Sequence, residues 1–383
     1  MDAELTEEQN AIRAMALEFA RTKLAPHALD WDEKKTLPTA TLREAAALGM
    51  GGVTADESLG GSGLGRLEAA IIFEALATGC PSVAAFLSIH NMAVWMIDAF
   101  GSTEFRQRVV PDLVAMESIA SYCLTEPGTG SDAAALATRA TREGDSYVVD
   151  GVKQFISGAG ASDWYVTMTR TGGAGASGIT ALAVHKSSPG LSFGANERKM
   201  GWNAQPTRQV IFENCRVPAS NRLGEEGEGF RIAMKGLDGG RLNIAACSIG
   251  GAEAALERTL AYMSQRKAFG KSIDQFQALQ FRLADMATEL EAARALLHKA
   301  ARRLDAKDPD ATRLVAMAKR FATDVGFAVA DQALQLHGGY GYLAEYGIEK
   351  IVRDLRVHRI LEGTNEIMRL IVARGLIERA GSL

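Results

Sequence analysis

Residues 356–366, close to the C-terminus, include the group best suited to acid–base chemistry. The carboxylate of Glu362 follows the apolar residues Ile360 and Leu361 and precedes Gly363. Apolar neighbours would desolvate the carboxylate and raise its pKa, which suits a general base. Gly363 permits a backbone bend that other residues adopt only at a cost. The simpler interpretation of the spacing alone is a glycine turn before a terminal helix, with Glu362 solvated.

Two further segments could bind a flat or phosphorylated ligand. In residues 125–131, Pro127 and the glycines Gly128 and Gly130 impose an irregular loop. Its free N–H groups and hydroxyls could hydrogen-bond a polar ring, although a turn that ends a strand would use the same residues. Arg266 has a fixed charge and a forked set of donors that suit a pyrophosphate, although a solvated arginine would give the same pattern.

Glycine pairs mark two more candidate contacts. Residues 238–241 read Asp-Gly-Gly-Arg and interrupt a helical pattern. The glycines would allow close approach of a ligand and Arg241 could donate to it, whereas the alternative is a solvated helix start. Residues 335–339 end another helical pattern, and glycines after a helix are ordinary C-caps. His337 alone does not indicate catalysis.

The composition excludes several classes of protein. A chain of 383 residues is too long for one ordinary core, so two or three domains are expected. The hydrophobic content of 47% is normal for a soluble protein, and the net charge of -4 argues against a nucleic-acid surface. We find no apolar run of membrane-spanning length and no signal peptide, so we expect a cytoplasmic protein without membrane insertion. The cysteines and histidines lack metal-ligand spacing, and no metal site is predicted.

Helical patterns dominate both ends of the chain. Residues 6–9 form a capping box, and Asp308 before Pro309 predicts the start of a later helix. Two apolar stripes after residue 229 indicate a helical bundle. The first consists of Leu283, Met286, Leu290, Ala293 and Leu297, and the second of Leu314, Met317, Phe321, Val325 and Val329.

Between residues 118 and 228 the pattern changes to short apolar runs. Residues 147–156 contain two such runs joined by Asp150 and Gly151, which predicts a β-hairpin. Further strands are expected at residues 164–169, 179–185 and 208–212. The middle of the chain is therefore predicted to be rich in β-structure.

Four motifs, in the family's order and spacing, resemble those of the acyl-CoA dehydrogenases, which use FAD. They are residues 122–132, residues 266–270 with 276–277, residues 335–342 and residues 356–366. The resemblance covers essentially the whole chain. It implies an α+β multidomain fold with a homotetrameric assembly. The implied domains are an N-terminal α-helical domain (1–117), a middle β-barrel (118–228) and a C-terminal four-helix bundle (229–383).

The resemblance also assigns roles to individual residues, with Glu362 as the catalytic base. The residues expected to contact FAD are Tyr122, Cys123, Leu124, Thr125, Gly130, Ser131, Phe155, Ile156, Ser157, Arg266, Phe276, Gln277, Gln335, Leu336, His337, Gly338, Gly339, Thr364, Asn365 and Glu366. Those expected to contact the acyl-CoA are Ser131, Asp238, Gly239, Gly240, Arg241, Leu361, Gly363 and Arg374. The contacts from residues 335–339 are expected to reach a neighbouring subunit.

The implied reaction is the α,β-dehydrogenation of an acyl-CoA, with electrons passed to electron-transfer flavoprotein. Many straight-chain members have tyrosine before the catalytic glutamate, and many relatives have tryptophan at the position of Phe155. Leu361 and Phe155 therefore favour a short branched substrate, isobutyryl-CoA. Short straight-chain acyl-CoA and 2-methylbutyryl-CoA are the alternatives. An acyl-CoA oxidase and a non-catalytic helical scaffold are the rival classes.

Overall fold

The first part of the chain is helical. The computed structural model describes residues 5–381. The helices before the sheet are α1 (Glu7–Phe19), α2 (Ala28–Lys34), α3 (Thr39–Ala47), α4 (Arg66–Gly79), α5 (Pro81–Phe100) and α6 (Thr103–Val114). Helix α1 begins with the predicted capping box, in which Thr6 Oγ1 accepts from the Gln9 N–H at 3.2 Å and Gln9 Oε1 accepts from the Thr6 N–H at 3.0 Å.

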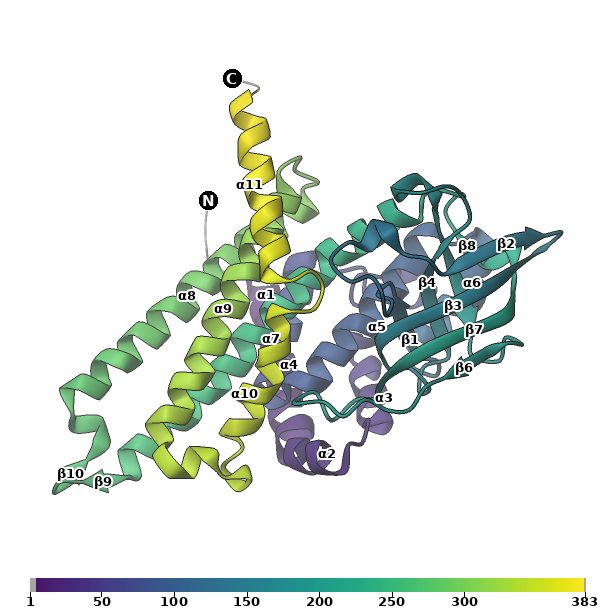
Figure 1. The fold of residues 1–383 in the computed structure, drawn as a ribbon. Coiled ribbons are helices and arrows are strands. Elements are labelled where there is room, and N and C mark those ends of the chain that lie inside the picture. The colour runs from purple at the N-terminus through teal and green to yellow at the C-terminus, as the bar shows by residue number, and fades with distance from the viewer. Residues whose placement is uncertain (1–4, 382–383) are drawn as a thin grey trace.

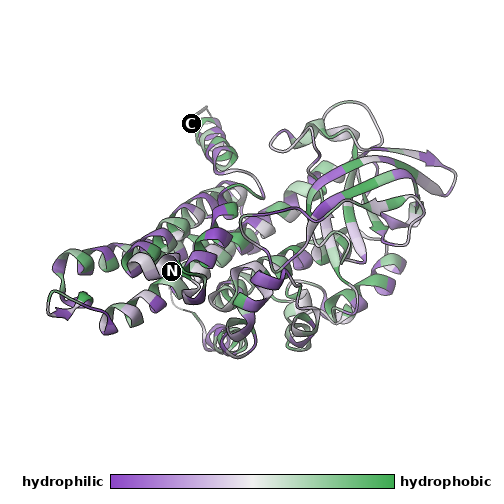
Figure 2. Ribbon diagram, turned by 60° about the horizontal axis from the view of Figure 1, so that its bottom comes forward, coloured by the Kyte–Doolittle hydropathy of each residue, from purple (hydrophilic) through white to green (hydrophobic). Residues whose placement is uncertain are grey.

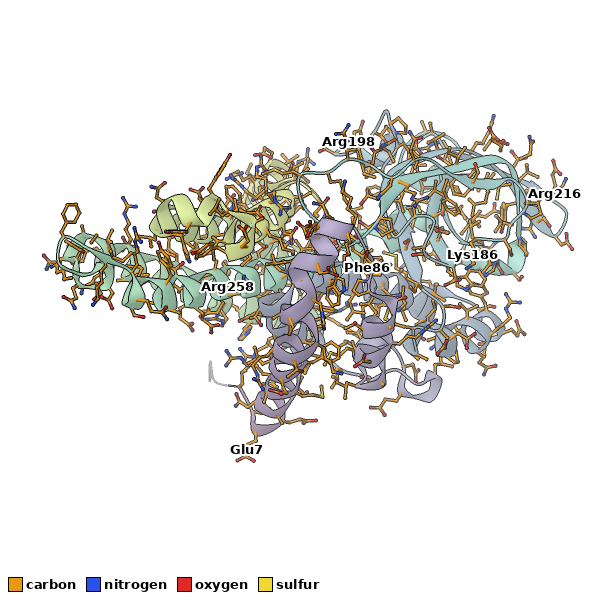
Figure 3. The ribbon with its side chains drawn as sticks, turned by 90° about the horizontal axis from the view of Figure 1, so that it is seen from below. Glu7, Phe86, Lys186, Arg198, Arg216 and Arg258 are labelled. Carbon is orange, nitrogen blue, oxygen red and sulfur yellow. The ribbon has the colours of Figure 1, made fainter. Side chains whose placement is uncertain are left out.

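Helix α5 lies at the centre of the molecule. By length and composition it could cross a membrane, contrary to the expectation that no such apolar run exists, but 83% of its apolar window is buried inside the protein. Asn91 is satisfied internally, because it accepts from the Val53 N–H at 2.8 Å and donates to the Met50 carbonyl at 2.9 Å. Phe86, on the same helix, lies in the interior where the helices meet the sheet (Figure 3). Helix α5 is therefore a core helix.

A single sheet follows the helices. Its strands are β1 (Ala120–Cys123), β2 (Arg139–Glu143), β3 (Ser146–Ser157), β4 (Trp164–Arg170), β5 (Ile179–His185), β6 (Leu191–Phe193), β7 (Thr207–Pro218) and β8 (Arg222–Leu223). Hydrogen bonds join them in the order β6-β7-β3-β2-β4-β5-β8, and β1 pairs with β4.

The hairpin predicted at Asp150 and Gly151 is wrong. Both residues lie inside β3, where the register with β7 shifts. Gly151 has φ +147°, and a Cβ there would lie 2.6 Å from Thr138 Oγ1, so the glycine serves a bulge and a close contact. The hairpin that does form joins β2 to β3, with Glu143 opposite Ser146 and Gly144 at φ +63°.

The last part of the chain is a helical bundle. Its helices are α7 (Gly229–Gln265), α8 (Gln277–Asp305), α9 (Ala311–His337), α10 (Ile348–Arg356) and α11 (Asn365–Gly381), and the short strands β9 (Lys267–Ala268) and β10 (Lys271–Ser272) join α7 to α8. The two apolar stripes pack into the largest hydrophobic cluster, as predicted.

Two predictions about helix boundaries are wrong. Residues 238–241 do not interrupt a helix but lie within α7, because their glycines make room for neighbouring side chains. Helix α9 begins at Ala311 after Asp310. Asp308 instead accepts from the Asp310 N–H at 2.8 Å in a turn before the helix.

The sheet and the far end of the bundle occupy opposite ends of the molecule (Figure 1). Helix α7 runs between them, from beside the sheet to β9 and β10. Hydrophobic and hydrophilic stretches alternate along the strands and around the bundle helices (Figure 2). Helices α4, α5 and α9 each pack against α7.

Candidate active site

Glu362 stands in a short irregular segment between α10 and α11. After α10 the chain makes one turn of 3₁₀-helix (Val357–Arg359), and Glu362 and Gly363 then both adopt positive φ, +54° and +94°. Such a conformation strains a glutamate and is ordinary for glycine. A Cβ at Gly363 would lie 2.6 Å from Met368 Cε, so a larger residue would displace the end of this side chain as well as strain the backbone. Thr364 Oγ1 then accepts from the Ile367 N–H at 3.3 Å and caps α11, as predicted.

A chain of hydrogen bonds holds the segment before Glu362. The Trp202 indole N–H donates to His358 Nε2 at 3.2 Å, and His358 Nδ1 lies 2.7 Å from Ser248 Oγ. An indole N–H can only donate, so Nε2 is the acceptor and Nδ1 carries the proton. Burial lowers the pKa of His358 to about 3, which keeps the ring neutral. His358 therefore positions the segment and is not available for proton transfer.

The Glu362 carboxylate is buried and has no partner. Neither oxygen has a hydrogen-bond partner within residues 5–381. A Cβ at Gly240 would lie 2.5 Å from Glu362 Oε2, so this glycine makes room for the carboxylate. Burial raises the pKa of Glu362 to about 7, and the charges of Lys319 and Arg241 act in the opposite direction. The solvated alternative for Glu362 is thereby excluded.

Two cations fix the backbone around Glu362 and not its carboxylate. Arg241 Nε donates to the Glu362 carbonyl at 3.0 Å, and Arg241 Nη1 donates to Asp238 Oδ1 at 3.0 Å. Lys319 Nζ donates to the Gly363 carbonyl at 2.8 Å and to Asn365 Oδ1 at 3.1 Å. The Glu362 N–H donates to no acceptor in the described part of the chain.

Lys319 was not predicted. It is fully buried in α9, and burial lowers its pKa to about 7. The apolar stripe from Leu314 to Val329 indicates only core packing, and Lys319 lies off that stripe. A lysine in the middle of a buried helix is the one signal that could have marked it, since lysine is almost never fully buried without a partner.

The sheet contributes a second group of predicted residues. The Tyr122 hydroxyl and Thr129 Oγ1 are buried and lack partners within residues 5–381. Phe155 adopts φ +59°, and 64% of it is exposed. Ser121 Oγ donates to the Ser157 carbonyl at 2.6 Å, which joins β1 to the end of β3. The Gln154 N–H donates to the Thr125 carbonyl at 2.8 Å, which joins the loop that carries Thr129 to β3. These hydroxyls and the exposed aromatic face of Phe155 are groups that suit a polar ring.

A buried ion pair shapes the loop beside these residues. Lys153 Nζ donates to Glu126 Oε1 at 2.8 Å and to the Leu124 carbonyl at 3.1 Å. The N–H groups of Ala137 and Thr138 donate to the same carboxylate at 2.6 Å and 2.8 Å. Glu126 lies within the predicted loop, but its pairing with Lys153 on β3 was not predicted, because no local pattern links the two.

The remaining predicted FAD contacts gather at the far end of the bundle, which we call the bundle tip (residues 262–277 and 335–346). Tyr262 stacks on His337 with ring centroids 4.4 Å apart, and Arg266 lies over Tyr340, 5.5 Å from the ring centroid. Gln277, Gln335, Gly338 and Gly339 are exposed, whereas Leu336 and His337 are buried. The bundle tip lies at the opposite end of α7 from the sheet (Figure 1), so one chain does not bring the two groups together.

Other predicted residues have varied surroundings. Leu361 is partly buried against the main core, and Ser131, Glu366 and Arg374 are exposed. Asn365 is buried, and its amide donates to Thr323 Oγ1 at 3.0 Å and to Asp324 Oδ1 at 2.9 Å, which makes it part of the scaffold.

The geometry near Glu362 permits one kind of chemistry. An unpaired carboxylate with a pKa near neutrality can take a proton from a weak carbon acid in a dry site. The free N–H of the same residue could stabilise negative charge that develops on a nearby oxygen.

Three family models match consecutive parts of the chain. "Acyl-CoA dehydrogenase, N-terminal domain" matches residues 6–117, the middle domain matches 121–215 and the C-terminal domain matches 227–377. The curated protein "Isobutyryl-CoA dehydrogenase, mitochondrial" of Bos taurus is 54% identical over 98% of this chain and 90% of its own length.

Solved structures agree in fold. Butyryl-CoA dehydrogenase from Megasphaera elsdenii superimposes with a TM-score of 0.95 at 38% identity, covering 98% of this chain and 100% of that one. A chain described under "Electron transferring flavoprotein of Acidaminococcus fermentans: Towards a mechanism of flavin-based electron bifurcation" superimposes with a TM-score of 0.96 at 40% identity. It covers 98% of this chain and 99% of the other.

Proposed function

The chain belongs to the acyl-CoA dehydrogenase family, and on that premise we propose that it dehydrogenates a short branched acyl-CoA, isobutyryl-CoA, to the enoyl-CoA. It is a flavin-dependent oxidoreductase. One observation carries the proposed reaction: within residues 5–381, the buried carboxylate of Glu362 has no hydrogen-bond partner and the backbone N–H of the same residue has no acceptor.

Glu362 acts as the general base. The α-hydrogen of an acyl thioester is only weakly acidic, so its removal needs a base in a dry site and stabilisation of the enolate oxygen. The carboxylate takes the α-proton, and the N–H of Glu362 donates to the thioester oxygen. Arg241 and Lys319 hold the two backbone carbonyls that follow this N–H, those of Glu362 and Gly363, so that the donor is fixed before the substrate arrives.

The cofactor is FAD, which when bound supplies the acceptor for the β-hydrogen and its electron pair. Residues 122–125, 130–131 and 155–157 form its binding surface on the sheet. Phe155 presents an aromatic face without an indole N–H. The Tyr122 and Thr129 hydroxyls, which lack partners within the described chain, are free to hydrogen-bond the cofactor.

The bundle tip completes the FAD site of a second copy of the chain. Arg266, Phe276, Gln277 and residues 335–339 are too far along the bundle to reach the sheet of their own chain (Figure 1). Exposed aromatic residues at the tip, including Phe269, favour contact with another copy. We propose a homotetramer of chains, each with domains at residues 1–117, 118–228 and 229–383.

Substrate choice rests on Leu361 and Phe155. A leucine before Glu362 takes less room than the tyrosine of many straight-chain relatives and admits a methyl branch next to the thioester. Identity of 54% to a protein named isobutyryl-CoA dehydrogenase supports this choice, and valine breakdown is then the pathway. One methylene changes binding by only about 1–3 kcal/mol, so butyryl-CoA and 2-methylbutyryl-CoA remain competing substrates.

Electron-transfer flavoprotein is the proposed electron acceptor. An acyl-CoA oxidase would use the same base and the same cofactor but would release peroxide during turnover. A non-catalytic scaffold would lack the chromophore altogether.

A panel of acyl-CoA thioesters tests the proposal. Specificity constants for isobutyryl-, 2-methylbutyryl-, butyryl- and octanoyl-CoA are measured with an artificial electron acceptor, and the cofactor released on denaturation is identified. We expect a yellow protein with about one FAD per chain and the highest constant for isobutyryl-CoA. An optimum at a straight chain of six or more carbons would contradict the substrate, and the absence of FAD would contradict the reaction. Leu361→Tyr should lower the preference for branched acyl groups.

A further inference from the structure

Arg66, the first residue of α4, is partly buried, and its guanidinium donates no hydrogen bond to any residue from 5 to 381. Its Cζ lies 4.7 Å from the centroid of the Trp95 ring. Burial lowers the pKa of Arg66 to about 10. A guanidinium that loses part of its water without gaining an acceptor destabilises a protein, so a conformation that leaves its donors open calls for an explanation.

The nearest carboxylates are already occupied. Asp305 accepts from the backbone N–H groups of Arg66 and Leu67 at 2.7 Å and 3.2 Å. Asp238 accepts from Arg241 at 3.0 Å and from the Thr312 hydroxyl at 2.7 Å. Both carboxylates favour a cation in this place, yet neither pairs with the guanidinium of Arg66.

The guanidinium lies beside the Glu362 pocket. A Cβ at Gly239 would lie 2.3 Å from Arg66 Nη1, just as a Cβ at the adjacent Gly240 would lie 2.5 Å from Glu362 Oε2. The two consecutive glycines of α7 thus make room for Arg66 and for Glu362. On the opposing helix, Trp95 follows Met92 by three residues, so the two side chains share one face of α5. Met92 Sδ would lie 2.8 Å from the same Cβ at Gly240.

We propose that Arg66 is a substrate-binding residue whose guanidinium donates hydrogen bonds to a phosphate or pantoate oxygen of the CoA chain. This inference rests on the proposed function. The isobutyryl group has no acceptor except the thioester oxygen, which is assigned to the N–H of Glu362. The CoA chain offers amide, hydroxyl and phosphate oxygens, and a planar fork held over an indole ring suits each of them.

Two variants and three substrates test the inference. Arg66→Met retains volume and removes charge and donors, and Arg66→Lys retains the charge without the fork. The matched control is Arg231→Met, which removes an arginine that also lies over an aromatic ring, 5.7 Å from the centroid of Phe100, but on the surface. The substrates are isobutyryl-CoA, isobutyryl-pantetheine without phosphates, and isobutyryl-N-acetylcysteamine, which lacks the pantoate portion as well.

For Arg66→Met we expect KM for isobutyryl-CoA and Kd for a CoA-bound enoyl product to rise about 10- to 100-fold, the range of one charge-assisted hydrogen bond, with kcat changed much less. Arg66→Lys should recover part of this loss, and Arg231→Met should match wild type. The increase in KM disappears with isobutyryl-pantetheine if the acceptor is a phosphate. It persists there and disappears with the cysteamine thioester if the acceptor is a pantoate oxygen.

An equal loss with all three substrates, or no loss with any, overturns the inference. If Arg66→Met does not fold, Gly239→Ala replaces it: the added methyl group displaces the guanidinium without altering its charge and should raise KM for isobutyryl-CoA but not for the cysteamine thioester. Failure of the wild-type enzyme to oxidise any acyl thioester would instead contradict the proposed function, so the two failures are distinguishable.

Discussion

The surroundings of Glu362 and the bundle tip hold the two halves of the predicted site, and they differ in which kind of group is left unsatisfied. In the pocket, polar atoms are buried without partners, as the Glu362 carboxylate and the Tyr122 hydroxyl show. At the bundle tip, apolar rings are exposed, with Phe269 95% and Tyr342 81% accessible. The surroundings of Glu362 thus contain buried polar atoms that suit a polar ligand, whereas the tip exposes apolar rings that suit contact with another protein surface.

The largest effect is expected from removing the base. Glu362→Gln retains shape and volume but cannot accept a proton, so the rate of flavin reduction by substrate should fall by about 10²–10⁴-fold. Stopped-flow bleaching of the flavin measures this rate. The matched control is Glu366→Gln, one helical turn further on, because the Glu366 side chain is 80% exposed and cannot be a dry base. Bleaching at the wild-type rate in Glu362→Gln would remove Glu362 from the mechanism.

Mixed oligomers test whether the tip serves another chain. Arg266→Ala removes a predicted phosphate contact and should weaken FAD binding by about 10-fold or more. Arg266→Ala and Glu362→Gln chains are given different tags and co-expressed, and the mixed oligomers are purified through both tags. In such an oligomer the Arg266→Ala chain supplies an intact Glu362, and the Glu362→Gln chain supplies an intact bundle tip. Activity near half that of wild type is then expected, because one of the two sites in a mixed pair is whole. If both halves of the site came from one chain, mixing would restore nothing.

The desolvated carboxylate also affects stability. The pKa of Glu362 is raised on folding from 4.5 to about 7, so the folded state holds this proton more tightly than the unfolded state. Its contribution to the free energy of unfolding therefore decreases as pH rises from 4.5 to 7 and is at its minimum above pH 7. Glu362→Gln does not titrate and should exceed wild type by about 3 kcal/mol at pH 8.

The excess free energy of unfolding of Glu362→Gln over wild type should decrease toward pH 4.5. Denaturant unfolding of both proteins at a series of pH values, with FAD held at saturation, measures it. A difference that does not depend on pH would mean that Glu362 is not desolvated in the folded protein.

The smallest effect is expected from Lys319, whose charge lowers the pKa of Glu362. In Lys319→Met the carboxylate is harder to deprotonate, and the rise of flavin reduction rate with pH should move to higher pH by about one unit. The matched control is Lys299→Met on the exposed face of α8. A lower maximal rate without displacement of the pH profile would mean that Lys319 acts only through its bonds to Gly363 and Asn365.

Local signals in the sequence predict local structure well. The capping box at Thr6, the two apolar stripes of the bundle and the cap at Thr364 are all confirmed, because each depends on residues one or two turns apart. Strands β4 and β5 also lie where short apolar runs predict them.

Sequence signals whose structural cause is a residue far away in the chain led to wrong predictions. Gly151 is an element of a bulge because Thr138 lies against it, and the glycines of residues 238–241 remain helical because Arg66 and Glu362 lie against them. A glycine in the sequence shows that no side chain is present at that position, but it does not show which neighbouring residue fills the space. For the same reason Lys319 and Lys153 were not predicted, since their partners lie 44 and 27 residues away along the chain.

The hydrogen bonds of Trp202 connect the part of the chain that forms the sheet to the helical bundle. Besides its indole bond to His358, the Trp202 N–H donates to Asp354 Oδ1 at 2.6 Å, and a Cβ at the preceding Gly201 would lie 2.4 Å from the Arg353 carbonyl. The sheet therefore cannot swing away from α10 without releasing the segment that holds Glu362. The amide hydrogen of Trp202 exchanges with solvent only when the fold itself comes apart.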